Sequence, residues 1–233
     1  MFEGIVLIAS VLIGGAASWA VKTDTVFFRL SLAFSGAFLF GTIILHLIPD
    51  LYHADAPSIG LWVLLGFGIQ LFLDFISKGL EHGHFHAHGS KLPLLPLLGL
   101  FLHAMIEGMP LAEHGVNHDH SHHGTGLIWS IALHKMPIAL LVTSALRKAK
   151  IPTAWVVITL LFFAISTPLG SFAGQFLSDI RLPILGVATG LLLHVSTTIL
   201  FENNESHTYG RYKLIAILVG LVVALLAVNL HIH

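Results

Sequence analysis

Four polar residues stand out inside two apolar stretches of the sequence: His103 and Glu107 in one stretch, His134 and Lys135 in the next. An ionised side chain at the centre of a membrane helix costs roughly 2.5 to 3.5 kcal/mol on insertion scales, so such groups normally face a partner, water or an ion. His103 and Glu107 are four residues apart, which places them on one face of a helix. His134 lies at a comparable depth in the next, antiparallel stretch. Two imidazoles and one carboxylate could therefore converge between the two helices.

This set of ligands suits a divalent transition metal. Two histidines and a carboxylate, with water in the remaining position, form an open site for Zn²⁺, and Fe²⁺, Mn²⁺ or Cd²⁺ can also bind such a set. Labile nitrogen and oxygen ligands also allow the ion to leave. The simpler alternative is that both histidines bond to carbonyl groups while Glu107 and Lys135 neutralise each other. For the convergent set we favour the metal site.

The elements that must position these residues are membrane spans. Of the 233 residues, 55% are hydrophobic and only 10% are charged, and the mean hydropathy is +0.87. Eight apolar stretches approach the ~20 residues that cross a bilayer: 4–21, 28–49, 60–80, 92–112, 126–146, 152–172, 183–201 and 213–230. Backbone amides in lipid must be paired within the segment, so these stretches should be helices. The sequence predicts an all-α polytopic membrane protein with eight transmembrane helices in a single domain, 1–233.

The Lys and Arg residues predict the orientation. Nine of the eleven lie in alternate connections or next to them, Arg181 alone lies on the opposite side, and Lys135 is inside a span. Connections rich in Lys and Arg stay in the cytoplasm, so both termini should be extracytoplasmic. We expect the protein in the plasma (inner) membrane. The absence of cysteine excludes disulfides and thiolate metal sites. The net charge of −1 argues against a nucleic-acid surface.

Two connections are rich in histidine. The segment 81–91, predicted to be cytoplasmic, carries His82, His84, His86 and His88, and the segment 113–125, predicted to be extracytoplasmic, carries His114, His118, His120, His122 and His123. Alternating histidines can meet one ion, but ordering a flexible segment costs entropy, so we expect weak, adaptable metal capture. The alternative is a solvated polar loop with no function.

Weaker candidates flank the proposed site. At the outer end of the second span, His46, Asp50, His53 and Asp55 could form an entrance for cations, or they could cap the helix at the interface. His194 in the inner half of the seventh span and Glu202 at its inner end could line an exit.

The motifs as a whole resemble those of the ZIP (Zrt/Irt-like) family of divalent metal transporters. The resemblance is carried by residues 103–108, His-Ala-Met-Ile-Glu-Gly, followed by residues 134–137, His-Lys-Met-Pro. Residues 45–50, Leu-His-Leu-Ile-Pro-Asp, and 166–170, Ser-Thr-Pro-Leu-Gly, look like the family's second and sixth helices. The resemblance implies import of a divalent metal, Zn²⁺ above all, with His103, Glu107 and His134 as ligands in the membrane. It leaves a homodimer open.

The sequence departs from the family pattern where many members bind a second ion. Ala104, Lys135, Ile138 and Thr167 occupy the positions that carry its ligands in those members. We therefore expect one ion. The ammonium of Lys135 should replace the second ion by pairing with Glu107, as in the branch of the family that has Lys after the span-five His.

The leading function is a secondary transporter that works by alternating access. The P-loop pattern Gly-x-x-x-x-Gly-Lys-Ser/Thr is missing, so ATP hydrolysis is not expected. An intramembrane zinc hydrolase is one alternative, although it needs a general base and His-Glu-x-x-His is also missing. A non-transporting metal sensor is the other. We expect a transporter and not an enzyme.

Overall fold

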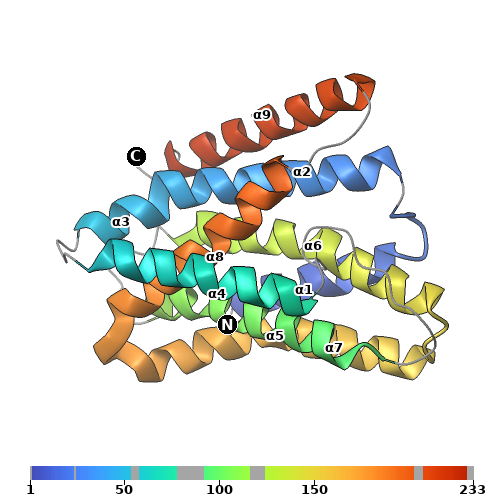
Figure 1. Cartoon of the computed structure of the whole chain (residues 1–233), viewed down its shortest axis with the longest axis horizontal. Coiled ribbons are helices and arrows are strands. Elements are labelled where there is room, and N and C mark those ends of the chain that lie inside the picture. The colour runs from blue at the N-terminus through green and yellow to red at the C-terminus, as the bar shows by residue number, and fades with distance from the viewer. Residues whose placement is uncertain are drawn as a thin grey trace.

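The chain folds entirely into helices and connecting turns in the part that the computed structural model describes, residues 2–23, 25–53, 58–77, 92–115, 124–201 and 207–229. The helices run roughly parallel or antiparallel to one another along the long axis of the molecule (Figure 1). They are α1 (Phe2–Ala17), α2 (Val26–Thr42), a π-helical turn (Ile43–Leu47) that continues into α3 (Ile48–His53), α4 (Ile59–Ser77), α5 (Leu94–Gly108) with a 3-10 turn (Met109–Gly115), α6 (Gly124–Lys148), α7 (Thr153–Gly174) with a 3-10 turn (Gln175–Ile180), α8 (Arg181–Phe201) and α9 (His207–Asn229).

Seven helical segments among the described residues are long and apolar enough to cross a membrane. The chain is thus an all-helical, multi-pass membrane protein. The first predicted span, residues 4–21, is only partly matched, because α1 has 16 residues and ends at Ala17. At 1.5 Å per residue such a helix is about 24 Å long, less than the ~30 Å hydrocarbon core. Its last turn tightens into bonds between residues three apart, such as Ser18 N–H to the Gly15 carbonyl.

Proline shapes the end of the fourth predicted span. Pro110 has no N–H to give to Ile106, so one bond of the α-helical ladder is missing there. α5 accordingly ends at Gly108, and the Met109 N–H bonds to the Ile106 carbonyl in a 3-10 turn. In contrast, α6 and α7 continue through Pro137 and Pro168 as single helices.

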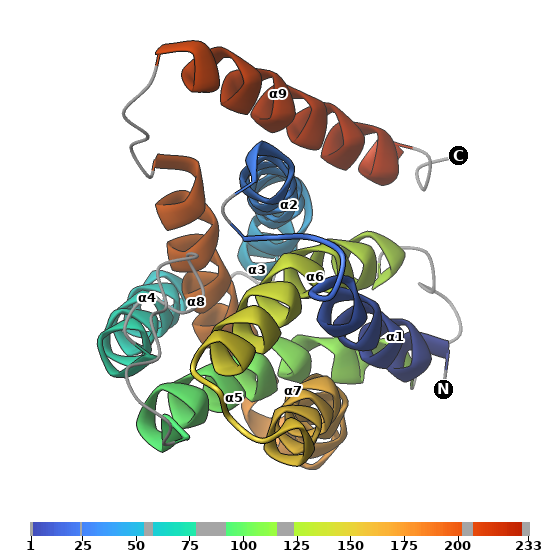
Figure 2. The same cartoon turned by 90° about the vertical axis from the view of Figure 1, so that its right-hand side faces the viewer.

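The described helices form two groups. The first group is α1, α5, α6 and α7, in which α1 packs mainly on α6 and α5 on α7; the second group is α2, α4, α8 and α9, in which α4 packs on α8 and α2 on α9. In the view along the helices, α9 lies outside α2, and α4 lies beside α8 (Figure 2). The main contacts between the groups are α2 with α6 and α4 with α5.

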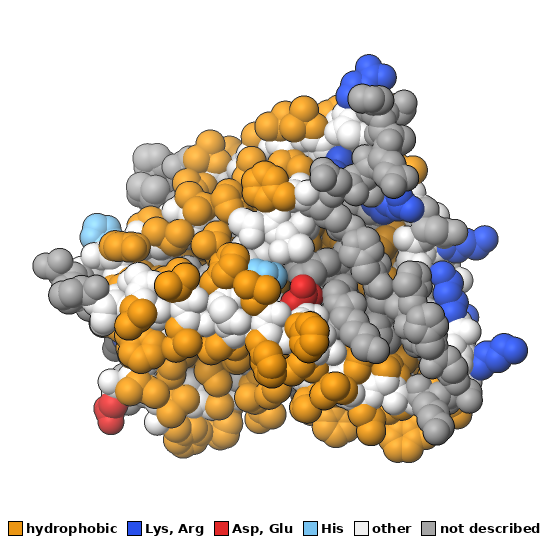
Figure 3. Space-filling view, viewed as in Figure 1, with side chains coloured by type: hydrophobic (Ala, Val, Ile, Leu, Met, Phe, Trp, Pro, Cys, Tyr) orange, Lys and Arg blue, Asp and Glu red, His pale blue; other side chains and the backbone are white. Residues whose placement is uncertain are grey.

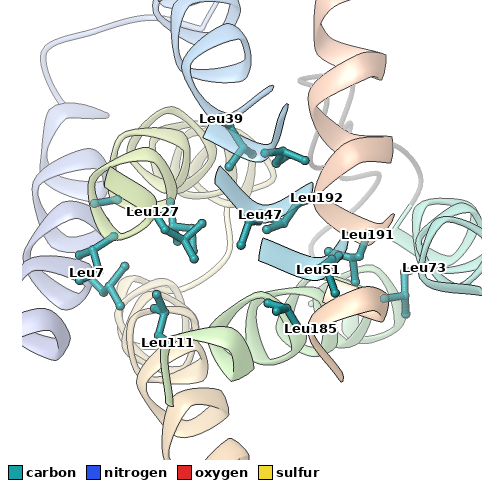
Figure 4. Packing of buried hydrophobic residues seen from close by; sticks show 14 of the residues in the cluster. Leu7, Leu39, Leu47, Leu51, Leu73, Leu111, Leu127, Leu185, Leu191 and Leu192 are labelled. Carbon is teal, nitrogen blue, oxygen red and sulfur yellow. The ribbon is translucent and has the colours of Figure 1, made fainter. Parts of the chain in front are cut away.

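A cluster of buried leucines joins the two groups. It includes Leu7 and Leu127 from the first group and Leu39, Leu73 and Leu191 from the second (Figure 4). Lipid tails are as apolar as leucine, so in a membrane this cluster stabilises the fold through close packing and not through escape from water.

The surface of the molecule matches a membrane environment. Hydrophobic side chains cover most of the face shown in Figure 3, and the Lys and Arg side chains on that face gather at one end. Large exposed apolar residues are found all along the helices, including Phe27, Phe75, Phe162 and Leu225. Such a belt would aggregate in water but is what a lipid-facing surface requires.

Candidate metal centre

A buried ion pair lies at the centre of the first helix group. Lys135 of α6 places its Nζ 2.6 Å from Oε1 of Glu107 on α5, and both side chains are 1% exposed. The predicted pairing of these two residues is therefore present. A buried charge needs a partner of opposite charge and further hydrogen bonds to offset its loss of hydration. The surroundings of Lys135 meet this need.

Residues of α7 complete the surroundings of the ammonium. Lys135 Nζ donates to Oγ1 of Thr167 at 2.6 Å, and the ring centroid of Phe163 lies 4.3 Å from Nζ. Thr167 Oγ1 is also 2.9 Å from the Ala104 carbonyl oxygen and 3.0 Å from Glu107 Oε1, and its single proton can be donated to one of them at a time. A carboxylate, a hydroxyl and an aromatic face thus hold one cation.

Close approach of the backbones of α5 and α7 makes this arrangement possible. A Cβ added to Gly108 would collide with the carbonyl oxygen of Thr167, and one added to Gly170 would collide with that of Met105. The two glycines let the helices touch through their main chains. This contact brings Thr167 within hydrogen-bond distance of Glu107.

His103 lies on the other side of Glu107. Its Nε2 is 3.3 Å from Glu107 Oε2, and its Nδ1 is 2.9 Å from Oε1 of Gln70 on α4. An amide oxygen can only accept, so the contact with Gln70 is a hydrogen bond when Nδ1 carries the proton. In that tautomer Nε2 presents a lone pair toward the carboxylate.

His134 is fully buried on α6, immediately before Lys135. Within the described ranges, however, no three His, Asp or Glu side chains are gathered as a metal site. The structure brings His103 and Glu107 together, and the convergence of His134 with them stays a prediction.

Three residues of this centre were not predicted to act in it. Gln70 and Phe163 were not singled out, and Thr167 was noted only as a position without the family's acid. Gln70 carries a signal that could have been used, because it is the single amide in the apolar helix α4. Phe163 has no such signal, since aromatic residues are common in membrane helices.

The predicted entrance is partly described. His46 lies in the π-helical turn, and its Nδ1 is 3.3 Å from Oδ2 of Asp50 one turn later. His46 is buried, whereas Asp50 and His53 are exposed. Single π-helical turns often occur at functional sites. Asp55 lies outside the described residues.

The predicted exit is also partly described. His194 of α8 is buried and packs edge-to-face on Phe67 of α4, with 4.8 Å between the ring centroids. Glu202 lies outside the described residues. So do the loop histidines His82, His84, His86, His88, His118, His120, His122 and His123, and only the backbone of His114 is described.

Comparison with known families gives one finding. The profile described as ZIP Zinc transporter matches residues 86–227, which is more than half of the chain and includes His103, Glu107, His134 and Lys135. The matched part begins before α5 and extends into α9. No curated protein matches the chain. The family is one of divalent metal transporters, and the seven long apolar helices among the described residues agree with a multi-pass membrane protein. The chain therefore belongs to the ZIP zinc transporter family.

Proposed function

We propose that the chain imports a divalent transition metal, Zn²⁺ before Fe²⁺, Mn²⁺ or Cd²⁺, into the cytoplasm through one site in the membrane. Membership of the family supports divalent metal transport as such. The identity of the ion, the direction of transport and the single site are the proposal. The membrane potential would favour inward movement by ~2.3 kcal/mol per charge per 100 mV.

The observation that carries the proposal is the facing pair of His103 Nε2 and Glu107 Oε2. With Nδ1 protonated and Nε2 not, two acceptor atoms lie 3.3 Å apart in a buried site, and a proton or a metal ion between them would relieve their repulsion. A zinc ion bound at about 2.1 Å from each atom would make an angle of about 104°, near the tetrahedral angle. This spacing supports the proposal of a shared ion.

The other ligands would come from the neighbouring helix and from water. Glu107 Oε1 bonds to Lys135 and Thr167, so Oε2 is the oxygen that faces His103 and can take the metal. His134, buried on α6 beside Lys135, is the proposed third ligand. Water would fill the fourth position, as in other open zinc sites, and would allow release.

The position of Lys135 supports a stoichiometry of one metal ion per chain. Its ammonium lies against Glu107 and Thr167, and Thr167 occupies one of the positions that carry second-ion ligands in other family members. The cation of the side chain then supplies the positive charge that a second metal would supply. This substitution balances charge in the buried site without a second ion.

A path to and from the site is proposed at both ends. His46, Asp50, His53 and Asp55 would collect cations outside, and His194 and Glu202 would lead them inward.

The proposed ligands all belong to the first helix group, so alternating access could arise from movement of this group against the second. The His-rich segments 81–91 and 113–125 would capture or sense metal. The plasma membrane location, the extracytoplasmic termini and a homodimer remain predictions.

Uptake of radioactive zinc into proteoliposomes tests the proposal. The variants His103→Ala, Glu107→Ala and His134→Ala should lose at least about 10-fold in uptake, because loss of a residue that only orients a ligand already costs about 10- to 100-fold. Thr143→Ala is a matched control, because Thr143 is also buried on α6 but is not a proposed ligand. Competition with Fe²⁺, Mn²⁺ and Cd²⁺ would identify the preferred ion.

Other results would identify the alternatives. Zinc binding without uptake by the wild-type protein would favour the sensor. Metal-dependent cleavage of a lipid or peptide would favour the hydrolase. Unchanged uptake in all three ligand variants would overturn the proposed site.

A further inference from the structure

The face of α4 that meets α5 carries one polar side chain opposite the metal centre. Gln70, Leu73 and Ser77 form one buried stripe on α4. Gly99 of α5 lets this stripe come close, because a Cβ there would lie 3.2 Å from the Leu73 carbonyl oxygen and 3.3 Å from the Ser77 Cβ. His103 is one turn after Gly99 on the same face of α5. The close contact at Gly99 thus brings Gln70 opposite His103.

The resulting hydrogen bond determines which nitrogen of His103 faces the site. Gln70 is fully buried, and its Oε1 lies 2.9 Å from His103 Nδ1. Because the oxygen accepts, this contact favours the tautomer with the proton on Nδ1 and the lone pair on Nε2. Nε2 is the atom that faces Glu107 Oε2. Without the acceptor, the proton could move to Nε2 and block metal binding.

We infer that Gln70 is a positioning residue, which holds His103 in the tautomer and ring orientation that can bind the transported ion. The inference rests on the proposed function of His103 as a ligand. Metal-binding histidines commonly donate their other ring N–H to an acceptor that orients them, and loss of that acceptor typically costs about 10- to 100-fold in affinity or activity.

The bond also links the two helix groups. Gln70 belongs to α4 of the second group, and His103 belongs to α5 of the first. A slide of α5 along α4 by one residue is about 1.5 Å, enough to break a bond of this length. His103 would then be held for metal binding only while the two groups keep this alignment. Movement of the groups would break the bond that orients His103 at the same time as the ion is released.

Three variants separate the acceptor function of Gln70 from packing. Gln70→Leu removes the acceptor, Gln70→Glu keeps one, and Leu73→Met changes the neighbouring position on the same stripe at similar volume. Zinc titration of the purified full-length protein should give a dissociation constant about 10- to 100-fold higher for Gln70→Leu. Gln70→Glu and Leu73→Met should stay within a few-fold of the wild type. If Gln70→Leu does not elute as a folded protein, Gln70→Ala makes the same test with a smaller side chain.

The tautomer itself provides a second readout. Nitrogen-15 NMR of histidine-labelled protein without metal distinguishes a protonated Nδ1 from a protonated Nε2, and the signal of His103 is the one that disappears in His103→Ala. The wild type and Gln70→Glu should show the proton on Nδ1, and Gln70→Leu should lose that preference.

Two results would overturn the inference: an unchanged zinc affinity in Gln70→Leu, or an unchanged tautomer in that variant even if affinity falls. Failure of the proposed function would look different. In that case proteoliposomes would take up no metal with the wild-type protein or with any variant at position 70.

Discussion

At the scale of single residues, the charge of Lys135 is the feature that most constrains the centre. Its ammonium is held by Glu107, Thr167 and the ring of Phe163, all buried. Removing one partner of a buried ion pair typically costs about 3 to 5 kcal/mol, because the other charge is left alone. Lys135 is therefore needed for stability if no second cation takes its place.

Replacing Lys135 tests this substitution. Lys135→Glu puts a second carboxylate beside Glu107, so without metal the protein should unfold at a lower temperature, and zinc should restore the stability. Zinc binding measured by calorimetry should rise from one to two ions per chain. Lys135→Met is the control, since it removes the charge without adding a ligand and should bind no more than one ion. A stoichiometry of one in Lys135→Glu would contradict the role of Lys135 as a replacement for the second ion.

At the scale of helices, the contact of α5 with α7 positions the centre. Glu107 and Thr167 meet because Gly108 and Gly170 allow the two backbones to touch. A methyl group at either glycine must push the helices apart, and overpacking of this kind costs typically about 1 to 3 kcal/mol. The same displacement would lengthen the bonds from Thr167 to Lys135 and Glu107.

Gly108→Ala should therefore lower both thermal stability and zinc uptake. Gly68→Ala is the matched control, because Gly68 lies inside α4 and a Cβ there meets nothing within 4 Å. Alanine in that helical position removes the ~0.5 to 1 kcal/mol cost of glycine, so this variant should be at least as stable as the wild type. Thermal unfolding in detergent, followed by circular dichroism, measures the difference. Equal melting temperatures for the two variants would argue against close packing of α5 on α7.

At the scale of the whole molecule, the distribution of Lys and Arg predicts how the protein lies in the membrane. On the face seen in Figure 3 these side chains gather at one end of the molecule. Arg147 and Lys148 close α6 and contact the turn after α1, through the Ser18 carbonyl and the Thr23 hydroxyl. Cations near the ends of spans are kept in the cytoplasm during insertion.

Two cysteine variants test this orientation directly, since the chain has no cysteine of its own. Ser58, just before α4, and Thr153, at the start of α7, are both exposed and carry hydroxyl groups. The predicted topology puts Ser58 on the extracytoplasmic side and Thr153 on the cytoplasmic side. In intact cells a membrane-impermeant maleimide should label Ser58→Cys and should label Thr153→Cys only after permeabilisation. The reverse pattern would place the termini in the cytoplasm.

The sequence by itself determined most of the helical spans and the importance of His103, Glu107, His134 and Lys135. Both follow from local physics: apolar runs must pair their own backbone in lipid, and residues four apart share a helical face. These rules found His103 with Glu107, and charge balance found the pairing with Lys135. They placed the end of the first span too late, because hydropathy continues past Ala17 where the helix does not.

Only the tertiary structure decided which distant residues meet. Gln70 is 33 residues from His103 along the chain, and Thr167 is 60 residues from Glu107; each pair forms because glycines let particular helices approach closely. The division of the helices into two groups is likewise a result of packing. Hydropathy and spacing describe one helix at a time, whereas contacts between helices depend on the shapes of both surfaces.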